Sequence, residues 1–246
     1  MLRVGVLTPH AAAGPEVELP DMAPGRVTAV VARVRPADAT ASWTPPSTAA
    51  GLRALAGPSE VDRAAASFRG GSVEVVAYAS TSSGYVLGHR GEAALVERVR
   101  RSCGVPVVAS GSSAVEALRA CGSRRVALVH PPWFDDEIDD LGIRYFRDQG
   151  FEVSLSTATG LPDDPARVRP EHVVDRVVRH VGDRADAVFI GGNGLRAARA
   201  IEELERRTGL LVLESNQVML WSILAVTGTP WTVTGYGRLF RDVRFG

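Results

Sequence analysis

The sequence predicts an α/β protein of two pseudo-symmetric domains, each a short parallel sheet flanked by helices, with a cleft between them. Short apolar runs rich in Val, Leu and Ile alternate with amphipathic stretches of helical length, a pattern typical of parallel sheets covered on both faces. Glycines stand where those helical stretches should end, because glycine accepts the left-handed backbone of a helix cap. The second half of the chain also repeats the first.

Seven apolar runs are predicted as strands. Their ranges are 3–7, 27–34, 73–79, 105–109, 125–129, 187–190 and 210–213. Each run is short and continuously apolar, as expected for strands buried on both faces of a parallel sheet.

Local signals predict where several helices begin and end. Pro170 fits the first position of a helix that continues over residues 172–181. Two segments, 59–62 and 113–116, have the serine and acid spacing of capping boxes at helix starts. Helix ends are predicted before Gly104, Gly122, Gly150 and Gly209.

The internal repeat has a long period. Segments 3–9, 73–79 and 104–110 resemble segments 125–131, 185–191 and 209–215, in the same order and at similar spacing. A solenoid unit is much shorter, so two homologous α/β domains that face each other explain the repeat better. The predicted domains are 1–111 with 217–246, and 112–216. Ligands of such sheets bind beyond the carboxyl ends of the strands.

Composition narrows the possible partners. The 246 residues carry 28 Lys+Arg and 28 Asp+Glu, so no basic face is expected and nucleic acid is not predicted as a partner. No apolar run is long enough for a membrane span. A strand is predicted from residue 3, which leaves no secretory signal, so we expect a cytoplasmic protein. Two cysteines are too few for a disulfide framework or a cysteine-based metal site.

Four polar loops follow predicted strands, at residues 8–15, 80–85, 129–134 and 191–196. The hydroxyl run of the second loop precedes a helix, where hydroxyls and free amides can bind a carboxylate or an enolate oxygen; plain N-capping is the alternative. The glycines of the fourth loop let a ligand approach the backbone. Their spacing is neither a dinucleotide fingerprint nor a phosphate loop.

Several pieces in fixed order resemble the aspartate/glutamate racemase superfamily, and within it the arylmalonate decarboxylases and maleate cis-trans isomerases. The resemblance covers nearly the whole chain. The matching pieces are Pro9 with the alanine-rich turn after it, and segments 78–82, 107–110, 114–118, 124–128, 190–196 and 214–217 with Trp221.

The resemblance implies cofactor-free chemistry at a carbon next to a carboxylate, with one cysteine from each half on opposite sides of the substrate. The first cysteine position falls on Ser80 and the second on Gly192, so a pair of thiols is absent. A serine hydroxyl is far less acidic than a thiol and needs an adjacent base to react. Cys103 and Cys121 precede predicted helix-end glycines and are predicted to be structural.

Histidine is the side chain best suited to replace a thiol in proton transfer near neutral pH. His10 and His130 follow repeat-related strands, one in each half; the alternative for His130 is a loop histidine bonded to backbone. The predicted catalytic residues are Ser80, His130 and His10. The predicted substrate-binding residues are Pro9, Thr81, Ser82, Ser83, Tyr85, Pro132, Trp133, Gly191, Gly192, Asn193, Gly194 and Asn216. No metal or other cofactor is predicted.

The predicted function is that of a cofactor-independent lyase, such as a decarboxylase, or an isomerase. Its substrate would be a small carboxylate or dicarboxylate, and its intermediate would resemble an enediolate. The alternative is a small-carboxylate binding protein that has kept the cleft and lost the thiol chemistry. A hydrolase that uses Ser80 is a weaker alternative, because no nucleophile-elbow pattern surrounds this serine. Both a monomer and a homo-oligomer agree with the sequence.

Overall fold

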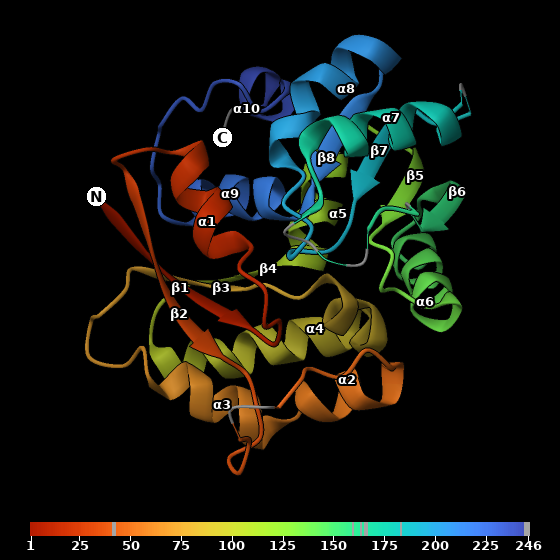
Figure 1. Cartoon of the computed structure of the whole chain (residues 1–246). Coiled ribbons are helices and arrows are strands. Elements are labelled where there is room, and N and C mark those ends of the chain that lie inside the picture. Colours follow the sequence, from red (N-terminus) through yellow and green to blue (C-terminus); the bar gives the residue numbers. More distant parts are fainter. Residues whose placement is uncertain (41–42, 159, 163, 165–166, 183, 244–246) are drawn as a thin grey trace.

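The computed structural model describes residues 1–40, 43–158, 160–162, 164, 167–182 and 184–243. Two separate four-stranded parallel sheets form the core, with strand orders β2-β1-β3-β4 and β6-β5-β7-β8 (Figure 1). The matching orders confirm the predicted fold class of two similar α/β halves. The first sheet contains β1 (Leu2–Thr8), β2 (Val27–Arg33), β3 (Val75–Tyr78) and β4 (Val107–Ala109). The second contains β5 (Arg125–His130), β6 (Glu152–Ala158), β7 (Ala187–Ile190) and β8 (Leu211–Glu214).

All seven predicted strands are present, with ends that differ from the prediction by two residues at most. The sequence analysis missed β6, which lies at the edge of the second sheet. Its sequence, EVSLSTA, places Ser and Thr between its apolar residues. An edge strand is only partly covered, so it lacks the continuous apolar run that identified the others.

Helices cover both faces of the first sheet. The helices that precede β5 are α1 (Pro15–Met22), α2 (Ala49–Leu55), α3 (Pro58–Ala66), α4 (Thr81–Cys103) and α5 (Ser110–Ala120). Leu19 and Met22 of α1 share an apolar cluster with Val4 and Val6 of β1. Helices α3 and α4 contribute to the cluster on the opposite face. Because neighbouring strand residues point to opposite faces, these short runs are apolar throughout.

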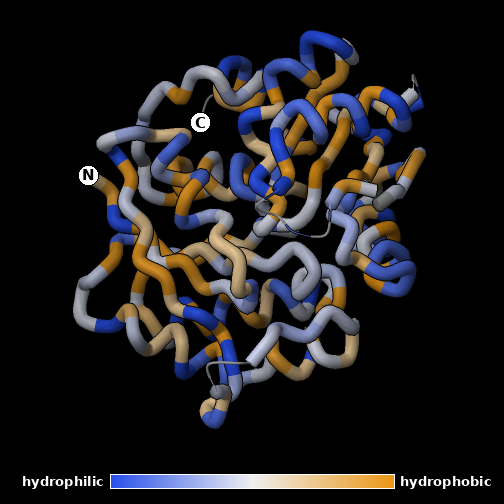
Figure 2. The backbone as a smooth tube through the Cα atoms, in the orientation of Figure 1, coloured by the Kyte–Doolittle hydropathy of each residue, from blue (hydrophilic) through white to orange (hydrophobic). Residues whose placement is uncertain are grey.

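The second sheet is covered in the same way. Its helices are α6 (Asp136–Arg147), α7 (Pro170–His180), a short 3₁₀ turn (Ala198–Ala200), α8 (Ile201–Thr208), α9 (Ser215–Val226) and α10 (Arg238–Asp242). Hydrophobic residues concentrate in the strands, whereas hydrophilic residues are frequent on the outer helices (Figure 2). Within the described part of the chain, no helix has the length and apolar character that crossing a bilayer requires.

Helix-end glycines are confirmed, but both predicted capping boxes are wrong. Gly104 and Gly209 cap α4 and α8 with φ of 78° and 72°. Helix α3 already begins at Pro58, and α5 begins at Ser110. The serines of the predicted boxes therefore lie inside their helices. A capping box that the sequence analysis missed begins α9, where Glu214 and Gln217 bond each other's backbone amides.

Helices α5 and α9 pack against each other between the sheets. Helix α5 follows the first sheet, but Ala114 and Leu118 lie in one apolar cluster with Leu128 and Leu213 of the second. Helix α9 follows the second sheet and contacts β3 and β4 of the first. The two helices thus cross over between the halves.

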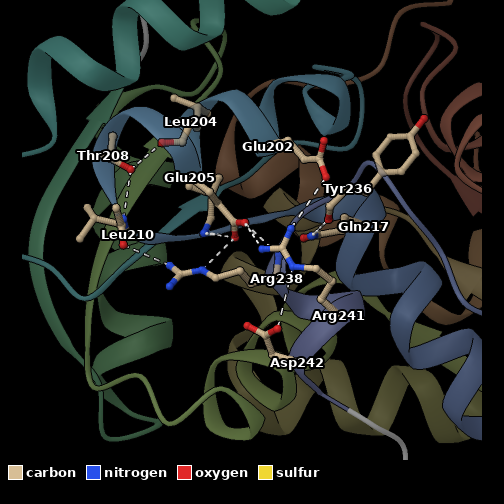
Figure 3. A network of polar contacts seen from close by, with 12 residues as sticks. Glu202, Leu204, Glu205, Thr208, Leu210, Gln217, Tyr236, Arg238, Arg241 and Asp242 are labelled. Atoms are coloured by element: carbon tan, nitrogen blue, oxygen red, sulfur yellow. Dashed lines mark hydrogen bonds and ion pairs between the residues drawn. The ribbon is translucent and has the colours of Figure 1, made fainter.

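The C-terminal helix α10 lies beside α8 and β8, on the second sheet (Figure 1). The sequence analysis groups it with the first domain. Arg238 and Arg241 hold it there through the largely buried carboxylate of Glu205, whose Oε1 also accepts the Val212 amide (Figure 3). Gln217 donates to the Tyr236 carbonyl at 2.7 Å and ties the start of α9 to the same segment.

Candidate functional site

The two halves meet through direct polar contacts at the carboxyl ends of their strands. Asn193 Oδ1 accepts the Thr81 amide at 3.0 Å and lies 3.1 Å from the Thr81 hydroxyl. The Gly192 amide in turn donates to Thr81 Oγ1 at 3.1 Å. Thr81 begins α4 after β3, and Asn193 follows β7. The parallel strands therefore bring together the second and fourth predicted loops.

Two further serines complete this junction in a pseudo-symmetric way. Ser110, the first residue of α5, donates to Asn193 Oδ1 at 2.9 Å. Ser215, the first residue of α9, lies 3.0 Å from Thr81 Oγ1. Helices α5 and α9 thus each begin with a serine that contacts the other half of the molecule: Ser110 contacts Asn193, and Ser215 contacts Thr81. The repeat aligns Ser110 with Ser215, and that alignment was the available signal for two residues that the sequence analysis did not select.

A hydrogen-bonded chain continues from the junction to two buried acids. Asn193 Nδ2 donates to Asn216 Oδ1 at 2.9 Å, and Asn216 Nδ2 donates to Glu18 Oε2 at 2.6 Å. Glu214 Oε2 accepts the amides of Asn216 and Gln217. Predicted residue Asn216 therefore links Glu18 and Glu214 to the junction.

Burial controls the protonation of this acid pair. It raises the pKa of Glu18 to about 7, although bonds from Asn216 and Ala198 oppose the shift. Burial, and then the charge of Glu18, raises the pKa of Glu214 well above its usual range. Among the described residues, none is hydrogen-bonded to Glu214 Oε1. Neither acid was predicted from the sequence. Glu214 had one signal: a carboxylate ends an apolar strand at the position where the first half of the repeat has Ala109.

Ser80 acts as the N-cap of α4. Its Oγ accepts the Ser83 amide at 3.3 Å and donates to Ser83 Oγ at 2.7 Å. No histidine or carboxylate is hydrogen-bonded to this hydroxyl among the described residues, so no base is placed to activate it. Ser82 is also buried. This geometry agrees with the capping alternative for Ser80 and gives no support to a serine hydrolase.

Gly192 occupies a position that excludes a side chain. Its φ is +94°, in the region that favours glycine, and a Cβ there would lie 2.7 Å from Pro131 Cγ. Gly14 of the first loop is equally constrained, because a Cβ would lie 2.2 Å from the Asn193 carbonyl oxygen. The first and third loops therefore both pack against the fourth. A thiol at position 192 requires Pro131 to move.

His130 lies next to this junction, at the end of β5. Its side chain is fully buried; Nδ1 contacts Asp139 and Nε2 lies 3.1 Å from the Tyr85 hydroxyl. A Cβ at Gly191 would lie 2.9 Å from His130 Cδ2 and 3.4 Å from Thr81 Cγ2. The imidazole thus adjoins the second and fourth loops. Tyr85 itself is buried in an aromatic cluster beneath them.

His10 has different surroundings. Burial and the nearby Arg33 guanidinium lower its pKa to about 4, so it is neutral at physiological pH. Its Nε2 has no hydrogen-bond partner in the part of the chain that the structure describes. The repeat pairs His130 with Thr8 rather than with His10, and the two histidines share no hydrogen-bond partner among the described residues. Neutral His10 has little capacity to donate a proton.

The remaining predicted residues surround the first and third loops. Pro9 is buried, Pro132 is partly buried, and the partly buried Trp133 ring lies 3.8 Å from the position of a Cβ at Gly194. The side chains of the junction are sealed from solvent: Thr81, His130, Asn193 and Asn216 are 0% exposed. Both cysteines are free and lie at the ends of α4 and α5. Across the described ranges, no group of three or more His, Cys, Asp or Glu residues is arranged to hold a metal ion.

Known proteins are similar to this chain in sequence and in architecture. The sequence profile of the family described as "Arylmalonate decarboxylase" matches residues 57–240. Arylmalonate decarboxylase of Bordetella bronchiseptica is 29% identical over 173 residues, 68% of this chain and 71% of that protein. A maleate isomerase of Nocardia farcinica is 30% identical over 177 residues, 69% of this chain and 70% of that protein.

Solved structures agree in fold. The maleate isomerase Iso from Pseudomonas putida S16 superposes with a TM-score of 0.85 at 25% identity, covering 98% of both chains. A Nocardia farcinica maleate cis-trans isomerase, a cysteine-to-serine mutant with a covalently bound succinylcysteine intermediate, gives a TM-score of 0.82 at 26% identity, covering 99% of both chains. The relatives of known activity are thus enzymes, a lyase and isomerases. The family profile covers well over half of this chain, which therefore belongs to the arylmalonate decarboxylase family.

Proposed function

We propose that the protein is a cofactor-independent decarboxylase or isomerase that acts on a small carboxylate or dicarboxylate at the junction between its halves. The observation that carries the proposal is the set of donors around Asn193 Oδ1. The Thr81 amide and the Ser110 hydroxyl both donate to this oxygen, and the Gly192 amide points to the adjacent Thr81 hydroxyl. Preorganised donors of this kind stabilise the negative oxygen of an enediolate.

In this proposal, the Asn193 carboxamide occupies the position of a substrate oxygen. A carboxylate that enters the junction accepts the bonds that Asn193 Oδ1 now accepts, and the carboxamide turns away. Because a charged acceptor forms stronger hydrogen bonds than a neutral one, the exchange favours the ligand. The same donors then stabilise the negative charge that grows on the carboxylate oxygens, either as the C–C bond breaks and carbon dioxide leaves or as a proton is moved at the carbon next to the carboxylate.

His130 is proposed as the group that moves the proton. It is the histidine that adjoins Gly191 and Thr81, and neither thiol position of the family carries a cysteine here. Ser80 is committed to capping α4, and His10 has a pKa near 4. His130 therefore takes over the role that a thiol has elsewhere in the family.

Turnover in D₂O tests the proposal. The protein is incubated with phenylmalonate or with maleate, and proton NMR follows loss of substrate and deuterium at the carbon next to the carboxylate. We expect deuterated product with wild type and with His180→Asn, which changes an exposed helix residue, and a large loss of rate with His130→Asn. Equal rates in all three proteins would refute the role of His130.

A second function, carboxylate binding without turnover, is favoured by one observation: both nitrogens of His130, the proposed proton-transfer group, are already bonded within the protein, to Asp139 and to Tyr85. Calorimetry with malonate and maleate separates the two functions. Binding without any NMR-detected conversion supports the binding protein, whereas conversion supports the enzyme. A crystal soaked with malonate is expected to place a carboxylate between residues 80–84 and 191–194.

A further inference from the structure

Three polar side chains from different elements form a row behind the proposed site. Asp139 of α6 contacts Nδ1 of His130, which ends β5. On the other side of the imidazole, the Tyr85 hydroxyl of α4 lies 3.1 Å from Nε2. The imidazole is thus held at both nitrogens by helices from the two halves of the molecule.

The chemistry of these groups determines where the proton lies. An ionised carboxylate only accepts hydrogen bonds, so Nδ1 of His130 carries a proton and donates to Asp139. In the neutral imidazole, Nε2 then accepts from the Tyr85 hydroxyl. Ser156 of β6 donates to Asp139 Oδ1 at 2.8 Å and fixes the carboxylate in this position.

The charge states of the row agree with this assignment. Burial tends to raise the pKa of Asp139, but the hydrogen bond and charge of His130 and the bond from Ser156 lower it overall. Burial, and then the charges of Asp139 and Glu92, raise the pKa of Tyr85 well above 10. At neutral pH the carboxylate is therefore ionised and the phenol is protonated.

The surroundings leave the imidazole little freedom to turn. The Phe134 ring lies 5.2 Å from it, centroid to centroid, and a Cβ at Gly142 would lie 3.2 Å from His130 Cε1. Beyond Tyr85 lies Tyr145 of α6, whose ring centroid is 5.7 Å from that of Tyr85 and whose hydroxyl donates to Glu92 of α4. His130 is 0% exposed and the Asp139 side chain is 24% exposed, so Asp139 forms the solvent end of the row.

We propose that Asp139 is the positioning residue of His130: it holds the neutral imidazole in the tautomer with the proton on Nδ1 and leaves Nε2 as the basic nitrogen. The use of Nε2 in proton transfer rests on the proposed function. The positioning itself does not, because it concerns only contacts within the protein.

Nitrogen-15 NMR of histidine-labelled protein tests the positioning without any substrate. In wild type, we expect the Nδ1-protonated tautomer for the neutral ring, assigned by its loss in His130→Asn. In Asp139→Asn, whose carboxamide can donate as well as accept, part of the neutral ring should change to the Nε2-protonated tautomer. Asp140→Asn, one residue further along α6 and exposed, is the matched control and should keep the wild-type tautomer. Ser156→Ala keeps the carboxylate and should give a smaller change in the ratio of the two tautomers.

The outcomes distinguish the positioning role of Asp139 from the proposed function. An Nε2-protonated tautomer in wild type, or an unchanged tautomer in Asp139→Asn, overturns the positioning role even if the enzyme turns over. If Asp139→Asn does not fold, Ser156→Ala decides, and an unchanged tautomer ratio there counts against the proposal. Where the enzyme is active, kcat in Asp139→Asn should fall at least 10-fold. If the NMR spectra show the expected tautomers but no substrate is converted, the positioning role of Asp139 is supported and the proposed function is contradicted.

Discussion

Thr81 and Asn193 join the two halves of the molecule directly, because the amide and the hydroxyl of Thr81 lie 3.0 and 3.1 Å from Asn193 Oδ1. Asn193→Ala removes this acceptor and leaves buried donors unsatisfied. We expect the free energy of unfolding in urea to fall by about 1–3 kcal/mol. Malonate should restore more stability in this variant than in wild type, since a carboxylate can occupy the vacated donors. Equal effects of malonate on both proteins would contradict the proposed exchange of carboxamide and substrate.

His130→Asn is expected to lower kcat by roughly 10²–10⁴-fold, the usual contribution of general acid–base catalysis. It should also remove one limb of the pH–rate profile. Because His130 is fully buried and bonded at both nitrogens, the variant should also lose about 1–3 kcal/mol of stability. Rates are therefore compared at a temperature where circular dichroism shows that both proteins are folded. An unchanged pH profile would transfer the proton-transfer role to another group.

Glu214→Gln is expected to stabilise the protein increasingly as pH rises. The raised pKa of Glu214 keeps its proton in the folded state, whereas the unfolded chain releases it above the usual glutamate range. Wild type therefore loses stability as pH rises above that range, and Glu18, whose pKa is about 7, adds to this loss. Glutamine keeps one oxygen for the Asn216 and Gln217 amides and cannot ionise.

Urea unfolding at about pH 5 and about pH 8 measures this difference. Glu203→Gln is the control, because Arg206 donates to the exposed Glu203 carboxylate and lowers its pKa. The change in unfolding free energy of this variant relative to wild type should be small and of the opposite sign. A Glu214→Gln protein that is less stable than wild type at the higher pH would show that Glu214 is ionised when folded.

Gly192→Ala tests whether position 192, where the sequence predicts the second thiol position of the family, can hold a side chain. The positive φ and the short approach to Pro131 should cost about 1–3 kcal/mol. Gly194→Ala is matched, because Gly194 lacks a positive φ and its Cβ would meet Trp133 only at 3.8 Å; it should cost much less. Thermal unfolding compares the two. If both variants are as stable as wild type, the loop accepts a side chain and Gly192→Cys becomes a realistic route to a family-like site.

The sequence predicted those parts of the structure that depend on local pattern. Continuous apolar runs identified the buried strands, and glycine identified the left-handed caps at Gly104 and Gly209. Edge strand β6 was missed because its polar residues resemble those of a loop. Proximity of Thr81 to Asn193 followed from the repeat and from parallel strands, which bring loops to one edge of a sheet.

Other parts of the site depend on contacts between segments distant in sequence. The partners of His130 come from α6 and α4, and nothing near His130 in the chain specifies Tyr85. Glu18 and Glu214 gain their raised pKa values from burial between the halves. From their positions in the chain alone, both acids would be predicted as ordinary ionised side chains near the start of a helix. The obstruction at Gly192 likewise arises from Pro131, which lies on another strand-end loop.

The crossing of α5 and α9 affects how the molecule folds. Each helix covers apolar surface on the sheet that it does not follow in the chain, so a cut between the halves would leave each fragment with an exposed apolar face. The two sheets should therefore lose structure in one cooperative transition rather than two. Separate fragments 1–123 and 124–243 are expected to regain native circular dichroism only when they are mixed, as two parts of one folding unit.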